Sequence, residues 1–304
     1  MSVGLVYDPI YLGHDTGDHI ENGRRLGSIL EVLGTSGIQQ QLVGIAPESA
    51  SLEDLLLVHS AQHVARVDRS SSEGGGWLDG DTVTSPESYE AAIYAAGGTA
   101  KATEKVIKGE VQSAFALVRP PGHHATRTDA MGFCLFNNVA IAARAAVQKH
   151  GLERVVVVDF DVHHGNGTQD IFYGDANVLY ISTHQYPLYP GTGRVEETGV
   201  AGGRDRTLNI PLPPWCGDRE YLLAFEEIIV PAVRRFRPPA LEGRTVRRAH
   251  AGQDSGRFLV VPDSGSARDA ERQSPLDRLA AKLFTDDYWI SGEEAGDAEA
   301  SDED

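Results

Sequence analysis

The chain has 304 residues, of which 41% are hydrophobic and 23% are charged, so it can form a globular domain with a substantial core. Its formal net charge of −17 argues against direct binding to nucleic acid and suits a cationic substrate or partner. No apolar run approaches the ~20 residues that a helix needs to cross a bilayer, so we expect no contact with a membrane.

The cysteine content and the first residues bear on the compartment in which the chain works. Cys134 and Cys216 are the only cysteines, too few for a disulfide framework, and they are not spaced as a zinc-binding pair. The first residues, MSVGLVYDPI, lack the basic and then apolar stretch of a signal peptide. We therefore expect a cytoplasmic protein with reduced thiols.

From the amino terminus to about residue 236, apolar β-branched runs alternate with helical patterns. Ser51 and Asp54 are spaced as a capping box, and Ser85 is spaced to cap a long alanine-rich helix that ends near Ile107. In chain order the patterns predict a strand at 3–7, a helix at 24–33, the two capped helices from 52 and from about 86, a strand at 113–118, a helix at 137–149, strands at 154–159, 177–183 and 207–210, and a helix at 218–236.

This alternation predicts the fold class. Strands separated by helices that are long enough to cross over form an α/β fold with a mostly parallel sheet, covered on both faces. Ligands of such sheets bind beyond the carboxyl ends of the strands. The polar clusters of the sequence follow two of the predicted strands, so we expect the functional site at that edge.

The composition changes near residue 237, where Arg, Gly, Pro and Ser become frequent and one strand-like piece remains, at 258–261. We predict a folded domain over 1–240, a segment of different character over 241–292, and a tail over 293–304. The tail reads EEAGDAEASDED, with seven acidic residues and no basic one. Such a run of like charges is typical of a solvated, disordered segment.

The most informative stretch is VVVVDFDVHHGNGTQ, which begins at Val155. Side chains alternate along a strand, so Asp159, Asp161 and His163 lie on one side of it. Buried carboxylates are costly without a positive partner, and a divalent metal such as zinc accepts Asp and His ligands. The alternative is a hydrogen-bonded Asp/His pair that closes the strand end. Two carboxylates with an imidazole favour the metal site.

A second cluster, RPPGHHA at 119–125, follows the strand predicted at 113–118. The Pro-Pro-Gly turn ends that strand and brings His123 and His124 to the same edge of the sheet. Neighbouring side chains cannot share one direction, so we expect the two histidines to play different roles. A histidine beside a metal-bound water can act as a general base when a carboxylate or an amide fixes its ring.

Together with GFCLFNN, YIST and PGTG, these motifs occur in the order and approximate spacing of the histone deacetylase superfamily, which also contains bacterial acetylpolyamine amidohydrolases and acetoin-utilisation proteins. HIENGRRL at 19–26 resembles the amino-terminal HPExPxRL signature of that family, with Gly23 where a proline is usual. Asn166 is similar to the class II and bacterial branch. The resemblance covers about residues 1–240, which it identifies as a deacetylase-like catalytic domain.

The resemblance implies a three-layer, arginase-like α/β fold and a zinc hydrolase that acts on N-acetyl amides, either acetyl-lysine in proteins or acetylated polyamines. It implies that Asp161 and His163 are two of three ligands of one zinc ion. It also implies that His124 is the general base and that His123 stabilises the tetrahedral intermediate and protonates the leaving amine. Further implied residues are Asp159 and Asn166 as partners of the two histidines, Phe133 and Tyr189 as walls of the substrate tunnel, and Ser182 and Thr183 as contributors to a potassium site.

Two family features are absent from the sequence after residue 237: the GFDAH-like strand end that carries the third zinc ligand, and the GGY loop that carries the oxyanion-binding tyrosine. We therefore expect weak zinc binding, impaired turnover and an uncovered sheet edge where the family strand is missing. An active deacetylase, a non-catalytic acyl-lysine-binding homologue and a damaged gene product stay open, as do the particular substrate and the oligomeric state. After residue 250 we single out three carboxylates and one tyrosine hydroxyl that lie outside these two motifs: Asp254, Asp263, Asp269 and Tyr288.

Overall fold

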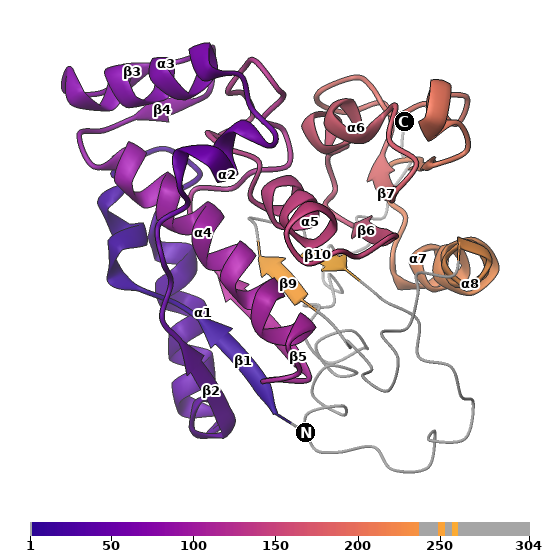
Figure 1. The fold of residues 1–304 in the computed structure, drawn as a ribbon, viewed down its shortest axis with the longest axis horizontal. Helices are drawn as coiled ribbons and strands as arrows, with labels where there is room; N and C mark the ends of the chain where they lie inside the picture. The colour runs from indigo at the N-terminus through magenta and orange to yellow at the C-terminus, as the bar shows by residue number, and fades with distance from the viewer. Residues whose placement is uncertain (1, 237–248, 253–256, 261–304) are drawn as a thin grey trace, which may run out of the picture. The chain divides into compact units, whose positions relative to one another are not determined.

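The computed structural model describes residues 2–236, 249–252 and 257–260, all within one compact unit, Ser2–Gly265. Its centre is an eight-stranded sheet in the order β2-β1-β5-β9-β10-β6-β7-β8 (Figure 1), and β3 and β4 form a separate antiparallel pair. The strands are β1 (Val3–Val6), β2 (Leu42–Ile45), β3 (Gly76–Trp77), β4 (Val83–Thr84), β5 (Ser113–Leu117), β6 (Val155–Asp159), β7 (Val178–Gln185), β8 (Thr207–Leu212), β9 (Ala249–Gly252) and β10 (Arg257–Val260).

The directions of the strands confirm the predicted fold class. Every neighbouring pair in the large sheet is parallel except the two that involve β10, which runs antiparallel to β9 and to β6. The expectation of an uncovered edge in place of the family strand was wrong. β9 pairs in parallel with β5, and β10 lies between β9 and β6, so these short strands close the middle of the sheet.

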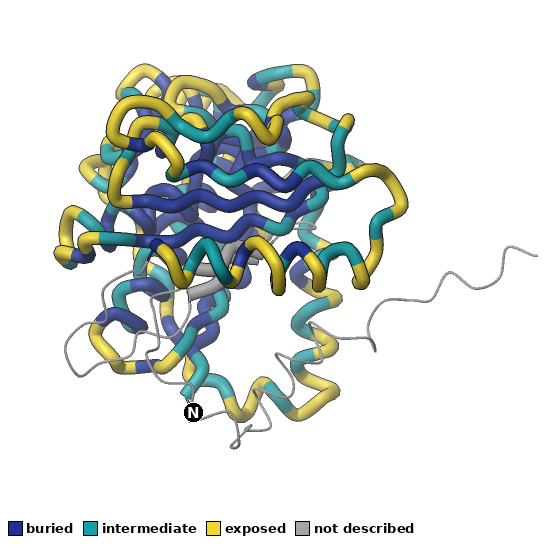
Figure 2. The backbone as a smooth tube through the Cα atoms, turned by 90° about the vertical axis from the view of Figure 1, so that its right-hand side faces the viewer, coloured by how far each residue is buried: buried dark blue, intermediate teal, exposed yellow. Residues whose placement is uncertain are grey.

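Different helices cover the two faces of the sheet. Along β6, Val155 and Val157 belong to the larger hydrophobic core with residues of α4 (Ser88–Ile107) and α5 (Asn138–Gln148). Val156 and Val158 pack in a second core with residues of α7 (Asp218–Ala224) and α8 (Val230–Phe236). A strand that is buried on both faces needs a continuous apolar run, which the four valines supply. Figure 2 shows several strands in dark blue, as buried stretches between more exposed segments.

Side-chain caps explain where two of the helices begin. Ser51 forms the expected capping box with Asp54 at the start of α2, and the Asn137 side chain accepts a hydrogen bond from the Ala140 N–H at the start of α5. None of the helices in the described part of the chain is both long and apolar enough to cross a membrane. The α-helices are α1 (Arg24–Thr35), α2 (Leu52–Leu56), α3 (Ala61–Ser72), α4 (Ser88–Ile107), α5 (Asn138–Gln148), α6 (Asn166–Phe172), α7 (Asp218–Ala224) and α8 (Val230–Phe236).

The predicted role of Ser85 as a helix cap was wrong. The helix α4 begins at Ser88, with Glu87 at its cap position. The Ser85 hydroxyl instead donates to the Gly13 carbonyl at 3.1 Å and accepts from the Asp15 N–H at 3.0 Å. Ser85 therefore ties the amino-terminal loop to the start of α4, a role that depends on a partner about 70 residues away and has no local signal.

The helix predicted at 218–236 is divided by a π-helical turn, Phe225–Ile229, between α7 and α8. Pro231 is the second residue after this turn. In a regular helix the proline ring would clash with the carbonyl four residues earlier and could not donate a hydrogen bond, so a wider turn there relieves the conflict.

Candidate active site

The two predicted polar clusters meet at one edge of the sheet, although they are far apart in the sequence. The strands β5 and β6 run in the same direction. β5 ends at Leu117, just before its cluster, and β6 ends at Asp159, the first polar residue of the other cluster. The Nδ1 atom of His123 lies 3.1 Å from Oδ2 of Asp159, and the rings of His124 and His163 are 6.0 Å apart. The fold therefore gathers both histidines and both carboxylates beyond the carboxyl ends of parallel strands, where ligands of such sheets bind.

His123 is supported by a carboxylate. Its Nδ1 atom pairs with Oδ2 of Asp159, and the Tyr180 hydroxyl donates to the same oxygen at 3.0 Å. Both partners in the pair are buried. Burial opposes the charged imidazole, but the negative charges of Asp159 and Asp161 outweigh it and raise the pKa of His123 above its ordinary value. This environment favours a protonated ring.

His124 is supported by a neutral amide instead. Its Nδ1 atom lies 2.8 Å from Oδ1 of Asn166, and the Asn166 Nδ2 group donates to the Met131 sulfur at 3.3 Å. An amide oxygen can only accept, so Nδ1 carries the proton and the basic lone pair is on Nε2. Burial and the neighbouring charge of His123 lower the pKa of His124 well below its ordinary value. This environment therefore favours the neutral form of His124, whereas that of His123 favours the charged form.

Asp161 and His163 follow the strand rather than belonging to it. The predicted alternation of side chains up to His163 was wrong, because β6 ends at Asp159 and the chain bends. Asp161 and His163 nevertheless face each other: Oδ1 of Asp161 accepts from the His163 N–H at 2.7 Å and lies 3.2 Å from its Nδ1. Burial would raise the pKa of Asp161, but the charge of His123 and the hydrogen bonds from His163 lower it to about 2.

These residues fit a zinc site only in part. Catalytic zinc in proteins normally has three protein ligands and one open position. Oδ1 of Asp161 and Nδ1 of His163 are 3.2 Å apart, close enough to bind one metal ion together. The described residues, however, contain no group of three or more His, Cys, Asp or Glu side chains that could hold a metal. The carboxylates and the tyrosine singled out beyond residue 250, namely Asp254, Asp263, Asp269 and Tyr288, lie outside the described residues.

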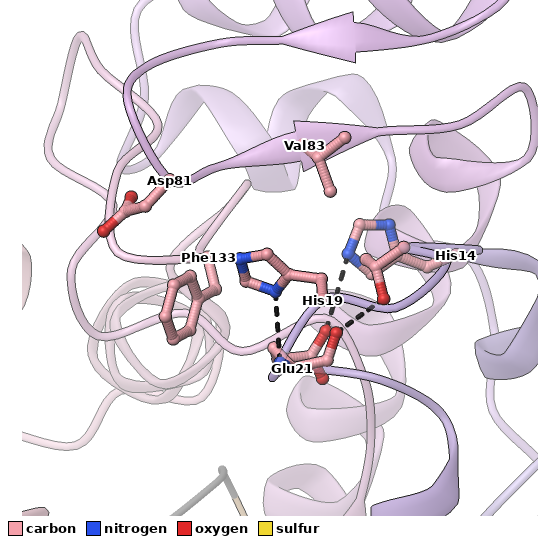
Figure 3. A pocket seen from close by; sticks show the side chains of 7 residues that line it. His14, His19, Glu21, Asp81, Val83 and Phe133 are labelled. Carbon is pink, nitrogen blue, oxygen red and sulfur yellow. Dashed lines mark hydrogen bonds and ion pairs between the residues drawn. The ribbon is translucent and has the colours of Figure 1, made fainter.

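The two aromatic side chains predicted to line the tunnel have different neighbours. The Tyr189 ring is 5.1 Å from the His124 ring and 6.1 Å from the His163 ring. The Phe133 ring packs edge-on against His19 at 4.8 Å. Figure 3 shows Phe133 and His19 at a small pocket next to the turn that carries Phe133, and the pocket is lined by His14, Thr16, His19, Glu21, Asp81, Val83 and Phe133.

Sequence reasoning missed a buried ion pair that supports this edge of the sheet. Nε of Arg119 donates to Oε1 of Glu21 at 2.7 Å, and both side chains are at most 1% exposed. Arg119 also donates to the Thr16 hydroxyl and to the carbonyl oxygens of Tyr11 and His14. The arginine begins RPPGHHA and the glutamate lies in HIENGRRL, so both were inside recognised motifs, but nothing local indicates that they pair.

Ser182 and Thr183, the predicted potassium residues, lie on β7 next to β6. Ser182 is opposite Asp159 in the register of the two strands, and its hydroxyl lies 2.9 Å from Nδ1 of His184. The Thr183 hydroxyl is buried and has no hydrogen-bond partner among the described residues. Neighbouring side chains of a strand point to opposite faces, so one ion could contact only one of these two hydroxyls.

An imidazole pair backed by a carboxylate and an amide, at the carboxyl edge of an α/β sheet, is suited to acid–base catalysis. Residues 19–244 match the model of the histone deacetylase domain. The chain therefore belongs to the histone deacetylase family.

Known proteins align with most of the chain. It is 43% identical over 258 residues to a probable deacetylase of Archaeoglobus fulgidus, an alignment that covers 84% of this chain and 70% of that protein. It is 41% identical over 278 residues to a histone deacetylase-like amidohydrolase of Pseudomonas aeruginosa, covering 91% and 72%. The crystal structure of the HDA15 HD domain matches with a TM-score of 0.74 at 39% identity, over 78% of this chain and 70% of that one.

Proposed function

We propose that this chain hydrolyses N-acetyl amides by acid–base catalysis at His123 and His124. The observation that carries the proposal is the unlike support of two adjacent histidines, by the Asp159 carboxylate at 3.1 Å and by the Asn166 amide at 2.8 Å. The carboxylate favours an imidazolium and the amide favours a neutral imidazole. One fold thus presents a proton donor and a proton acceptor side by side, as hydrolysis of an amide requires.

The two histidines divide the proton transfers. Nε2 of His124 accepts the proton of the attacking water, because its Nδ1–H is held by Asn166. His123 stabilises the negative charge that develops on the tetrahedral intermediate and then protonates the amine as it leaves, with Asp159 compensating its charge. Phe133 and Tyr189 are the proposed walls of the tunnel that holds the acyl-lysine stem.

We propose zinc as the cofactor, one ion per chain, with Asp161 and His163 as two ligands. When bound, zinc acts as a Lewis acid and lowers the pKa of a coordinated water. Because the described residues supply only two ligands, we expect weaker binding than in a site with three. Ser182 and Thr183 would contribute to a potassium site near Asp159.

The proposed substrates are acetylated lysine in proteins and acetylated polyamines. Both products are cations, which the net charge of −17 attracts. A cytoplasmic location is part of the proposal, and it is supported by two cysteines, Cys134 and Cys216, that are both free thiols.

The test measures acetate release from an acetyl-lysine peptide and from an acetylated polyamine by the full chain, with micromolar zinc and after chelation. Bound zinc is quantified by elemental analysis of the same samples. The proposal predicts hydrolysis of at least one substrate that disappears on chelation. Zinc-loaded protein that hydrolyses neither substrate would contradict it.

A second candidate is a non-catalytic acyl-lysine-binding homologue. The incomplete ligand set among the described residues favours it, because the walls and the histidine pair can bind an acyl-lysine stem without turnover. Saturable binding of the acetyl-lysine peptide with no acetate release would support this candidate over the deacetylase.

A further inference from the structure

The turn that carries Phe133 has an unusual backbone. Residues 131 and 134 exchange two main-chain hydrogen bonds, from the Met131 N–H to the Cys134 carbonyl at 3.2 Å and from the Cys134 N–H to the Met131 carbonyl at 2.9 Å. The two residues between them both have positive φ, 54° at Gly132 and 70° at Phe133. This is the pattern of a type I′ turn, which favours glycine or asparagine at both central positions. Phenylalanine there is strained, so something outside the turn must hold it.

The loop between β3 and β4, residues 78–82, supplies that support. The Thr82 hydroxyl accepts from the Phe133 N–H at 3.0 Å, and Oδ1 of Asp81 accepts from the Gly132 N–H at 3.2 Å. The same hydroxyl donates to Oδ1 of Asp81 at 3.1 Å. Thr82 is fully buried. Both central N–H groups of the strained turn are thus bound by one loop, about 50 residues earlier in the chain.

The loop between β3 and β4 is held by its own internal hydrogen bonds, which makes it a rigid support. Oδ1 of Asp79 accepts from the Thr82 N–H at 2.7 Å and from the Asp81 N–H at 3.0 Å. The Leu78 N–H donates to the Thr82 carbonyl at 2.8 Å. The Thr82 hydroxyl therefore has little freedom to follow the turn if the turn moves.

The turn also contacts the proposed general base. A Cβ atom added at Gly132 would lie 2.3 Å from Cδ2 of His124, so the turn backbone packs directly on that ring. The Met131 sulfur accepts from the Asn166 side chain that orients His124. A displacement of the turn would therefore shift both the tunnel wall and the supports of His124.

We propose that Thr82 is a positioning residue: its hydroxyl holds Phe133 in the strained turn and so sets the tunnel wall beside His124. This inference rests on the proposed function, because it concerns the same site. It predicts that loss of the hydroxyl loosens substrate binding more than it slows the chemical step.

The test compares Thr82→Val, which keeps the shape of the side chain but cannot accept from Phe133, with Thr82→Ser, which keeps the hydroxyl. Loss of one hydrogen bond predicts a KM for the acetyl-lysine peptide raised by about three- to tenfold in Thr82→Val, with a smaller change in kcat. The amide hydrogen of Phe133 should exchange faster by a similar factor. Thr82→Ser should restore both values to within about twofold of wild type.

A double variant separates positioning from general damage. If Thr82 acts through Phe133, the effect of Thr82→Val on KM should largely vanish in a Phe133→Ala background, because the wall that it positions is gone. Additive effects on KM, or unchanged exchange at Phe133 in folded Thr82→Val, would overturn the inference. If the wild type does not hydrolyse the peptide, the proposed function fails separately. Exchange at Phe133 and the dissociation constant of the peptide then replace KM in the same comparison.

Discussion

At the scale of single residues, the proposed function depends on which group pairs with the Nδ1 atom of each imidazole. His123 and His124 are adjacent in the sequence, and their rings lie 3.9 Å apart, but one pairs with a carboxylate and the other with an amide. The contrast gives the two rings opposite preferences for a proton. The supporting residues are thus as important to the division of roles as the histidines themselves.

We predict that Asn166→Ala lowers kcat for acetate release by roughly 10- to 100-fold and changes KM little, because His124 loses the partner that fixes its proton on Nδ1. Steady-state kinetics with the acetyl-lysine peptide measure both values. The matched control is Asn177→Ala, since the one hydrogen bond of that exposed side chain within the described part of the chain goes to the Glu153 carbonyl. Equal effects of the two substitutions would refute the role given to Asn166.

His59 provides a prediction about pH and stability. Its ring is 1% exposed, and its Nε2 accepts from the Asn137 N–H at 2.9 Å while Nδ1 pairs with the Thr126 carbonyl at 2.8 Å. Burial, followed by the charge of His63, lowers the pKa of His59 to about 3. In the unfolded chain the pKa of this residue is near 6.5. Between about pH 3 and pH 6.5, the unfolded chain therefore binds the proton more readily than the folded chain does.

His59 accordingly contributes stability that is complete above about pH 6.5 and is lost as the pH falls toward 3, by up to ~1.4 kcal/mol per pH unit. Urea unfolding between roughly pH 7.5 and 5 should show this slope, and His59→Gln, which cannot gain a proton, should show a smaller one. An identical slope in the two proteins would mean that other groups carry the acid sensitivity.

At the scale of elements, the close approach of α4 to the segment after β2 explains why Gly97 is a glycine. The Ala50 N–H donates to the Ile93 carbonyl of this helix at 2.9 Å, and a Cβ atom at Gly97 would lie 2.0 Å from the Glu48 carbonyl oxygen. Backbone packs against backbone there, which leaves no room for a methyl group.

We predict that Gly97→Ala destabilises the protein by about 1–3 kcal/mol through overpacking, even though alanine is the better helix former. The matched control is Gly27→Ala in α1, where a Cβ would meet nothing within 4 Å. That substitution should be neutral or should stabilise by up to ~1 kcal/mol. Denaturant unfolding of both variants measures the difference, and a stabilised Gly97→Ala protein would contradict the packing argument.

Local features of these elements could be predicted from the sequence, whereas contacts between distant segments could not. The strands β5 and β6 and the capping box at Ser51 could be predicted, because apolar periodicity and capping chemistry are local. The role of Ser85 and the support of Phe133 by Thr82 could not, because each depends on a partner brought close only by the fold. The alternation predicted beyond Asp159 failed because the chain bends where its polar groups bind one another.

At the scale of the whole molecule, one edge of a mostly parallel sheet gathers the histidine pair after β5, the Asp161 and His163 pair after β6, and Tyr189 after β7. The family to which the chain belongs was predictable from motifs, because they occur together and in order. Zinc binding and activity were not, since they depend on a third ligand that the described residues do not contain.

The most direct test of the central claim is the rate of acetate release by wild-type protein and by His124→Ala, with zinc content measured for both. His150→Ala, a change of a histidine that follows α5, is the control. The proposed base predicts a loss of about 10²- to 10⁴-fold in His124→Ala, unchanged zinc content and a normal rate in the control. A His124→Ala protein that releases acetate at the wild-type rate would contradict the assignment of His124 as the base.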